Sequence, residues 1–418
     1  FPDKVDADDD NDGVLDISDV FPLDAAESVD TDNDGTGNNA DTDDDGDGVE
    51  DQLDYFSLIS LGDLTDTDSD GIPDVCDQSC LDSGMMADVY PFGIIYVNDN
   101  STCDALTETC GVTWETAFPY LQDALSVAST NNNIWVAQGI YYPDEKQGIG
   151  AVNDSNSMSD YFEMQNYVGL YGGFSDDLLA TQLSDADYEN NLTILSGDID
   201  KDDTVDVNGL VAHYTDISDE SLTNFNSTHI IKDNSQTSYF VLQGFIINAA
   251  EVFSNTSGSV YLKYSGGLLK DLEFIAHRGK YGSAITLAGT RRDNNCSSME
   301  LQNINIKNSY VSSYGIIYID YSPCENITID GLSLTNNVGG TAFEIGTYDN
   351  VSIDGLVIEN DGNDKTAVYI ETGGSDATIS LENSLISGAS SAISVGGYGG
   401  KVNVSNTTIT SNTAAIEI

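Results

Sequence analysis

The chain of 418 residues carries a formal net charge of −58 with only 13 Lys and Arg, so it cannot neutralise the phosphates of a nucleic acid. It contains no apolar run near the ~20 residues that span a membrane as a helix. Most of the acid is local, since residues 1–82 hold 26 Asp and two Glu against the single base Lys4. Acid at this density repels itself and stays unfolded unless cations bind it.

Four segments of this acidic arm, residues 1–84, share one spacing. Each places oxygen-bearing side chains at positions 1, 3, 5, 9 and 12 of a loop and glycine at position 6, the pattern with which a tight loop surrounds a calcium ion. The candidate ligands are Asp8, Asp10, Asp12, Asp16 and Asp19; Asp30, Asp32, Asp34, Asn38 and Asp41; Asp43, Asp45, Asp47, Asp51 and Asp54; and Asp66, Asp68, Asp70, Asp74 and Asp77. No His or Cys occupies a ligand position, so several Ca²⁺ ions are expected rather than Zn²⁺.

The arm resembles thrombospondin type 3 repeats, most closely over residues 30–51 (DTDNDGTGNNADTDDDGDGVED), where one loop follows another without a helix. The resemblance implies a chain wound around a row of calcium ions with almost no apolar core. A dockerin is the alternative, but it needs a helix after each of two loops. Asp at position 12 is shorter than the bidentate Glu of calcium sensors, which favours structural sites. Cys76 and Cys80 are expected to pair at the end of the arm.

The second domain, residues 85–418, is expected to open with a cap and irregular first coils in residues 85–240. A strand is predicted at 94–97, and Cys103 and Cys110 are expected to pin the loop after it with a disulfide. An amphipathic helix is predicted next, where it would cover the first coil and shield its edge from other strands. Its apolar positions are Phe118, Leu121, Leu125 and Ala128, after a cap region at Thr116.

Three apolar segments follow this helix, at 134–140 (IWVAQGI), 168–174 (VGLYGGF) and 192–198 (LTILSGD). Together with the helix they resemble the opening of secreted bacterial β-helix proteins, many of which have no known activity. A partial fifth calcium loop comes next, in which Asp203 replaces the glycine of the template. Its candidate ligands are Asp198, Asp200, Asp202 and Asp206.

One pattern recurs seven times in residues 240–418. A strand that alternates apolar and polar residues is followed by Gly, Asn or Asp, which adopt a left-handed bend at least cost. The copies begin at Phe240, Gly267, Met299, Ile327, Val351, Ile379 and Val402, with bends at positions 244, 271, 303, 331, 355, 383 and 406. A second strand recurs between the bends and starts at Ala284, Ala342, Ala367, Ala392 and Ala415.

A repeat of 23–32 residues made of strands alone indicates coils stacked along an axis. The pattern resembles the right-handed parallel β-helix of the pectin-lyase-like superfamily, so an all-β solenoid with an N-terminal capping helix is predicted. A β-sandwich is the alternative, disfavoured because the second strand starts a similar distance after each bend. Cys296 and Cys324 each lie three residues before an aligned strand. Coils ~4.8 Å apart would allow a disulfide between them.

The six cysteines, in local or in-phase pairs, favour an oxidising and therefore extracellular compartment. Ten sequons permit glycosylation, at Asn100, Asn153, Asn191, Asn226, Asn255, Asn295, Asn326, Asn350, Asn403 and Asn406. We therefore expect a secreted or cell-surface structural or adhesive protein, a calcium-wound arm followed by a glycan-compatible β-helix. Its expected partners are surface glycans or further copies joined head-to-tail into a fibre, because the sequence stops within a coil at 415–418.

The resemblance to the pectin-lyase-like superfamily also implies an alternative, since that group includes polysaccharide lyases and hydrolases. The one dense basic group in the coils is His277, Arg278 and Lys280, which would serve as a base and substrate clamp. A solvated loop beside acidic neighbours is the favoured interpretation of this group, because fold alone does not carry function. A non-catalytic carbohydrate-binding β-helix is the remaining alternative.

Overall fold

The computed structural model describes residues 8–10, 14, 16, 19–32, 34–46, 51, 93–105, 109–129, 132–146, 157–177, 180–218, 226–233, 239–252, 258–279, 284–289, 296–313, 315–320, 324–347, 350–372, 377–397, 399–410 and 413–417. The chain divides into two compact units, Phe1–Gly93 and Ile94–Ile418, which we call the arm unit and the coil unit. Between residues 8 and 51 the described part of the arm unit consists of turns and bends. All the strands described below belong to the coil unit.

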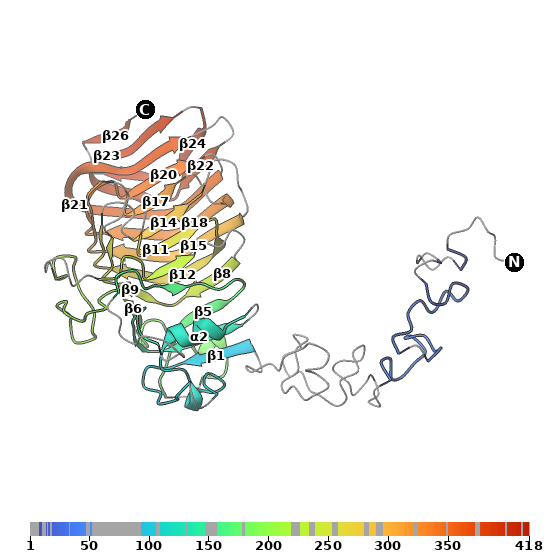
Figure 1. Ribbon diagram of the computed structural model, residues 1–418. Coiled ribbons are helices and arrows are strands. Elements are labelled where there is room, and N and C mark those ends of the chain that lie inside the picture. Colours follow the sequence, from blue (N-terminus) through green and yellow to red (C-terminus); the bar gives the residue numbers. More distant parts are fainter. Residues whose placement is uncertain are drawn as a thin grey trace. The chain divides into compact units, whose positions relative to one another are not determined.

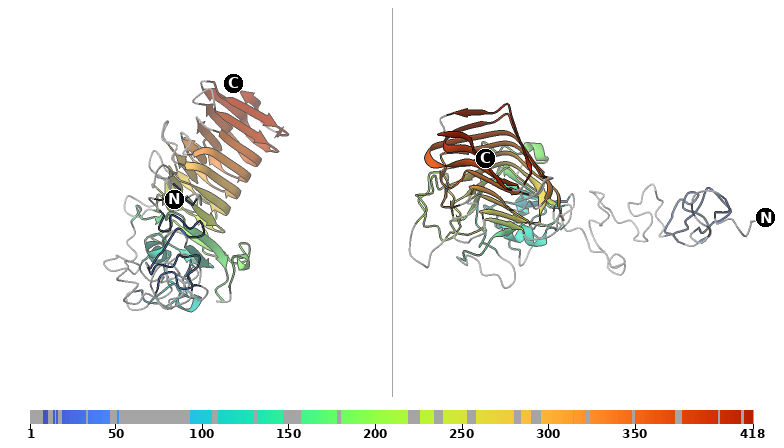
Figure 2. Two further views of the ribbon diagram at one scale, coloured as in Figure 1. Left: turned by 90° about the vertical axis from the view of Figure 1, so that its right-hand side faces the viewer. Right: turned by 90° about the horizontal axis from the view of Figure 1, so that it is seen from above.

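The coil unit is a parallel β-solenoid, as predicted, with its strands stacked along one axis (Figures 1 and 2). The helical elements are η2 (Trp114–Thr116), α2 (Leu121–Val127) and η3 (Leu183–Asp185). The strands are β1 (Ile94–Val97), β2 (Asn133–Ala137), β3 (Gly139–Tyr141), β4 (Phe162–Glu163), β5 (Gly169–Phe174), β6 (Thr193–Ser196), β7 (Ile231–Asp233), β8 (Tyr239–Gln243), β9 (Ile246–Asn248), β10 (Glu251–Val252), β11 (Val260–Lys263), β12 (Gly266–Ile275), β13 (Arg278–Gly279), β14 (Ile285–Ala288), β15 (Cys296–Lys307), β16 (Tyr310–Val311), β17 (Ile317–Asp320), β18 (Cys324–Thr335), β19 (Val338–Gly339), β20 (Phe343–Thr347), β21 (Asn350–Thr372), β22 (Thr378–Glu382), β23 (Leu385–Gly397), β24 (Lys401–Ser405), β25 (Thr408–Thr410) and β26 (Ala414–Glu417).

The register of the repeat is the one predicted from its alternating pattern. Phe240 pairs with Gly267, and the pairing continues in phase through Met299, Ile327, Val351 and Ile379 to Val402. The same row extends back through β5 and β2 to β1, before the point where the sequence pattern becomes regular. One inward position therefore forms an aliphatic column: Ile95, Ile134, Leu170, Leu242, Leu269, Leu301, Ile329, Ile353, Leu381 and Val404. All but Val404 are buried, so this column is a continuous part of the core.

The bends between strands confirm the second part of the pattern. All seven predicted bend positions have positive φ, from 45° at Asn406 to 81° at Gly244. Side-chain amides at the bends bond to the neighbouring coil, since Asn303 Nδ2 donates to Asp271 Oδ1 over 2.8 Å and Asn383 Nδ2 donates over 2.6 Å to Oδ1 of Asp354, the residue before the bend at Gly355. Asn and Asp at these positions therefore serve both the left-handed backbone and the contact between coils.

The second row of strands also holds the predicted phase, from Ile285 through Phe343, Val368 and Ile393 to Ile416. Four described members of this row, β4, β7, β11 and β17, were not predicted. Their aligned first positions are Tyr161, Ile230, Ser259 and Ile316 instead of the alanine that marks the other copies. A third row of two-residue strands, β10, β13, β16 and β19, was also missed, because two residues are too short to show a period.

The start of the coil unit carries the predicted helix as α2, with Leu121 and Leu125 buried. The helix lies beside β1 (Figure 1), but it does not supply the hydrogen bonds of that edge. Tyr96 N–H donates to Gly111 O over 2.9 Å, and Phe118 N–H donates to Tyr96 O over 2.8 Å. Phe118 is thus extended chain outside the helix, and the edge of β1 is paired by the segment around the disulfide loop.

The predicted disulfide between Cys103 and Cys110 is present, with an S–S distance of 2.03 Å. The backbone register places Cys296 opposite Cys324, as the coil alignment predicted. Cys324 is buried and disulfide-bonded. The proposed pair Cys76–Cys80 lies outside the described residues.

Candidate functional site

Three loops of the arm unit share one hydrogen bond that links loop position 2 to loop position 9. Asp9 N–H donates to Asp16 Oδ1 over 2.8 Å, and Asp44 N–H donates to Asp51 Oδ1 over 2.9 Å. In the loop between them, Thr31 N–H donates to the Asn38 side-chain oxygen over 3.0 Å. The bond fixes the predicted position-9 ligand over the start of each loop. Three sequence segments with one template thus adopt one local geometry.

The loop that starts at Asp30 shows how the other predicted ligands converge. Asp30, Asp32 and Asp34 each offer a carboxylate oxygen, and these oxygens lie within 4.8 Å of one another. Gly35, at position 6, has φ of 95° and donates its N–H to Asp30 Oδ2 over 3.0 Å. Asp30 Oδ1 is buried and accepts no hydrogen bond, and the same is true of Asp19 Oδ2 in the preceding loop. Carboxylate oxygens in this state lack the donors that normally accompany burial.

Part of the predicted ligand set cannot be placed in this way. Asp12, Asp47, Asp54, Asp66, Asp68, Asp70, Asp74 and Asp77 lie outside the described residues. The described members are Asp8, Asp10, Asp16 and Asp19, the set Asp30, Asp32, Asp34, Asn38 and Asp41, and Asp43, Asp45 and Asp51.

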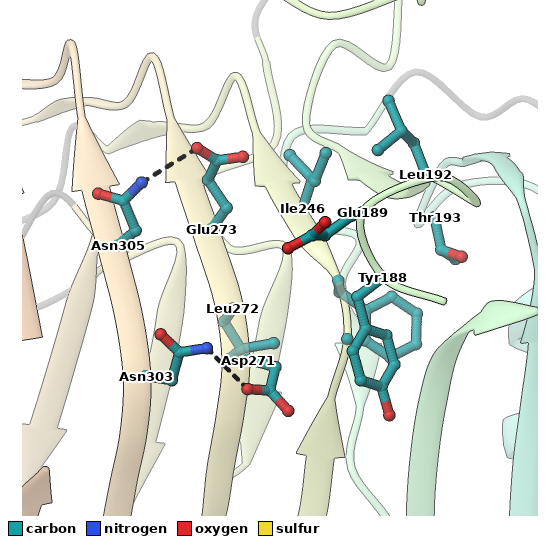
Figure 3. Close-up of a pocket in the computed structure, with 12 residues that line it drawn as sticks. Tyr188, Glu189, Leu192, Thr193, Ile246, Asp271, Leu272, Glu273, Asn303 and Asn305 are labelled. Carbon is teal, nitrogen blue, oxygen red and sulfur yellow. Dashed lines mark hydrogen bonds between the residues drawn. The ribbon is translucent and has the colours of Figure 1, made fainter. Parts of the chain in front are cut away.

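The coil unit has a groove of about 620 Å³ on the side of the bend row (Figure 3). Asp271 and Glu273 of β12 and Asn303 and Asn305 of β15 form two amide–carboxylate pairs along it, at 2.8 Å and 3.2 Å. Tyr188 stands at the opposite side of the groove (Figure 3). Carboxylates and amides on one side of the groove and a phenol on the other suit a polyhydroxylated ligand, because hydroxyl groups both donate and accept.

The position of Tyr188 depends on the glycine of the first bend. A Cβ atom at Gly244 would lie 2.1 Å from Tyr188 Cε1, so the Tyr188 ring can pack here only because Gly244 has no side chain. Burial, followed by the charge of Asp271, raises the pKa of Tyr188 to about 12, so its hydroxyl stays protonated. The sequence pattern identified the bend row but not this residue, because Tyr188 lies before the repeat, in the irregular segment between η3 and β6.

The basic group considered as a catalytic clamp is not arranged as one. His277 is fully buried, and its Nε2 lies 3.0 Å from Ile247 O. Burial lowers the pKa of His277 to about 3, so the ring is neutral and links two coils. Arg278 Nε donates to Glu251 Oε1 over 2.6 Å, and Lys280 lies outside the described residues. A base must reach its substrate, and the His277 ring has no exposed surface.

An acidic patch on β17, β20 and β21 was missed by sequence analysis. Glu344 is paired in register with Tyr318 and Tyr369, while Asp320 and Glu371 lie two residues further along their strands. Burial, followed by the charge of Glu371, raises the pKa of Glu344 to about 7. These acids occupy outward positions of the second strand row. The prediction of that row rested only on its inward alanine and apolar positions.

The predicted fifth loop has a different membership from the template. The carboxylates of Asp198, Asp202 and Asp203 converge within 4.8 Å. Asp206 instead accepts hydrogen bonds from the N–H groups of Asn208 and Leu210, at 2.8 Å and 3.0 Å. It therefore closes a turn of its own.

The sequons differ in their exposure. Asn100, Asn326, Asn350, Asn403 and Asn406 are exposed, Asn191 is half-buried, and Asn153, Asn255 and Asn295 lie outside the described residues. Asn226 is buried, and its Nδ2 donates to Asp203 Oδ2 and to Ala249 O, so in this fold the amide that would carry a glycan is already bonded within the chain.

Within the described residues, none of the helices has the length and apolar character that crossing a membrane requires. No protein-family model, curated protein or solved structure significantly matches this chain.

Proposed function

We propose that this chain is an extracellular structural or adhesive protein whose acidic arm, residues 1–84, is held in shape by Ca²⁺. The observation that supports this most directly is the shared geometry of the loops, each with the bond between positions 2 and 9. Buried carboxylate oxygens without donors, such as those of Asp19 and Asp30, add the need for a cation. Oxygen-only ligands favour a hard ion with six to eight contacts.

Calcium binding and folding would be one process in the arm. Its loops have few apolar side chains to bury, so most of the free energy of folding would come from the ions. The finer resemblances, to thrombospondin type 3 repeats for the arm and to the right-handed pectin-lyase-like β-helix for the coils, are consistent with this proposal. The disulfide between Cys103 and Cys110 fits a secreted protein, because cytosolic thiols are kept reduced.

A calcium titration of the full chain, followed by limited proteolysis, tests the proposal. Isothermal titration calorimetry should detect several ions, and a chelator should expose the arm to protease while Ile94–Ile418 stays protected. The double variant Asp30→Asn, Asp34→Asn should weaken calcium binding, because two carboxylate groups of one loop lose their charge. Asp24→Asn is the matched control, since Asp24 is an exposed arm residue outside the template. Equal protection of the arm with and without chelator would refute the proposal.

The groove in Figure 3 supports surface glycans as the binding partner of the coil unit. We propose non-catalytic recognition of a neutral saccharide, with Tyr188 against the sugar ring and the Asp271–Asn303 and Glu273–Asn305 pairs on its hydroxyl groups. Tyr188→Ala should abolish binding on a glycan array, whereas Tyr239→Ala, at a half-exposed tyrosine outside the groove, should not. Uronate release from pectin or alginate would instead favour the enzyme alternative.

The other proposed partner is a further copy of the chain in a head-to-tail fibre. Sedimentation in millimolar calcium and in chelator distinguishes it from glycan binding, because a fibre forms without any saccharide. If the protein is monomeric in both solutions, the fibre is excluded and only the adhesive function remains.

A further inference from the structure

A second hollow lies next to the groove of the coil unit. It has a volume of about 320 Å³ and is lined by β3, β6 and the loops beside them, including the turn after β1. Leu192 lines both the groove and this second hollow, and Figure 3 shows it on the side of the groove opposite β15. Glu189 lines the groove and the next residue, Asn190, lines the second hollow. The two spaces are therefore direct neighbours that share residues 189–192 as a wall.

One register row of the solenoid passes through both spaces. Asn305 of β15 pairs with Glu273 of β12, which pairs with Ile246 of β9. The row continues from Ile246 to Ile194 of β6 and then to Ile140 of β3. The first three positions line the groove, and the last two line the second hollow. Neighbouring coils are ~4.8 Å apart, so these four steps make a path of about 19 Å along the solenoid axis.

The second hollow combines aliphatic surface with amides and carboxylates. Ile140 and Leu192, both half-buried, supply the aliphatic part. The polar residues that line it are Asp99, Asn100, Gln138, Asp176, Asn190 and Asn208. Amides and carboxylates together donate to and accept from hydroxyl groups, while aliphatic side chains contact the C–H face of a sugar ring. The second hollow thus suits the same class of ligand as the groove.

Neighbouring groups hold part of this polar lining in place. Gln138 Nε2 donates to Asp176 Oδ1 over 2.9 Å, and Ile140 N–H donates to Asp99 Oδ2 over 3.2 Å. Each bond uses only part of the hydrogen-bonding capacity of an amide or a carboxylate. A ligand can therefore bond side chains whose positions are already fixed, which lowers the entropy that binding costs.

Charge limits the class of saccharide that fits. Asp271 and Glu273 line the groove, where Glu273 forms an ion pair with Lys307. Asp99 and Asp176 line the second hollow. Among the described residues that line either space there is no Lys or Arg. A uronate unit would place its own carboxylate against these acids, so a chain of uncharged sugars is favoured.

We propose that the groove and the second hollow together bind one linear, neutral oligosaccharide, with successive sugar units on the two sides of Leu192. The proposal rests on the proposed function of the groove and extends it from one sugar ring beside Tyr188 to a chain along the solenoid axis. A path of about 19 Å is longer than one sugar ring. Once one unit is bound in the groove, the units joined to it reach the second hollow at a high effective concentration. Affinity should therefore increase with the length of the chain.

Isothermal titration calorimetry of the full chain tests the proposal, with protein made in a host that does not glycosylate Asn100. The probes are linear oligomers of glucose, of mannose and of N-acetylglucosamine, from the disaccharide to the hexasaccharide. In the series that binds, the hexasaccharide should bind roughly tenfold more tightly than the disaccharide, or better. Equal affinities would overturn the proposal, even where Tyr188→Ala abolishes binding and so supports the groove by itself. Binding of none of the probes would overturn both.

A double variant separates the second hollow from the groove. Asn100→Ala with Asn208→Ala removes two exposed amides that line only the second hollow. It should lose the gain in affinity of the hexasaccharide and retain that of the disaccharide. Asn403→Ala, at an exposed position of β24, is the matched control and should bind every probe as the unmodified chain does. An unchanged circular dichroism spectrum checks that each variant is folded.

Two outcomes of this series count against the proposal. If the double variant keeps the full gain in affinity with chain length, the second hollow is not part of the site. If oligomers of galacturonate gain as much affinity with length as the neutral series, the assignment to a neutral chain is overturned.

Discussion

Glu344 gives the pH dependence of the coil unit a specific origin. Its side chain is half-buried, beside its in-register neighbours Tyr318 and Tyr369, and Glu371 adds a like charge. The pKa therefore rises from 4.5 to about 7 in the folded state. The folded protein then binds the proton more tightly than the unfolded chain, so stability is complete below pH 4.5 and falls as the pH rises to about 7.

The size of this effect follows from the shift and the exposure of the group. A shift of the pKa from 4.5 to about 7, at 1.36 kcal/mol for each pKa unit, sets an upper limit of roughly 3.4 kcal/mol on the change in the free energy of unfolding. Glu344 is only half-buried, so solvent screening reduces this to about 1–2 kcal/mol. Glu344→Gln removes the titrating group but keeps the size of the side chain and one acceptor oxygen. In the native protein, the N–H of Gly315 donates to Glu344 and favours its charged form.

Urea unfolding at pH 4.5 and pH 8, in saturating calcium, measures the difference. The free energy of unfolding of the unmodified chain should fall by about 1–2 kcal/mol more than that of Glu344→Gln over this interval. Glu359→Gln, at an exposed position of β21, is the control for the loss of one negative charge from a highly acidic protein. The reasoning is refuted if both variants shift the pH profile equally.

Two further predictions concern the repeat itself. Leu301→Ala, in the middle of the buried aliphatic column, should cost about 2–5 kcal/mol in urea unfolding, whereas Val404→Ala, at a position that is 37% exposed, should cost about 1 kcal/mol or less. Equal costs would mean that the column is not a continuous core. Asn303→Ala should destabilise by about 1–2 kcal/mol, because alanine is strained at φ of 52° and cannot bond Asp271, while Asn303→Gly should recover the strain but not the bond. A glycine variant no more stable than the alanine variant would argue against strain at this bend.

The sequence was sufficient for the coil register because two kinds of residue repeat together. The inward aliphatic positions set the phase of each strand, and a shift by one residue would turn them to the solvent. The Gly, Asn and Asp at the bends mark where each strand turns, and all seven have the expected positive φ. Rows that lack either signal were missed, as in β10, β13, β16 and β19.

The candidate sites were less accessible to this reasoning, because they depend on contacts between irregular segments. Tyr188 reaches the groove only because Gly244 leaves its backbone bare, and nothing in the local sequence of Tyr188 indicates this. His277 resembled an exposed base in sequence, but its position between two coils buries the ring. A fifth loop was predicted from its spacing, but the carboxylate that meets those of Asp198 and Asp202 belongs to Asp203, while Asp206 closes a separate turn.

The chain uses two different means of placing acids close together. Along the coil bends, acids meet amides: Asp271 accepts from both Gln243 and Asn303, at 2.8 Å each, so successive coils stack without repulsion. In the arm loops, acids meet acids, as in Asp30, Asp32 and Asp34, and we propose that a cation takes the place of the missing hydrogen-bond donor. Acids also meet acids within the coil unit, at Asp198, Asp202 and Asp203 and at Glu344 with Glu371. If the arm binds calcium as proposed, the ion should act on the arm loops and leave the amide-linked bends of the coil unit unchanged, since the charges at those bends are already satisfied within the chain.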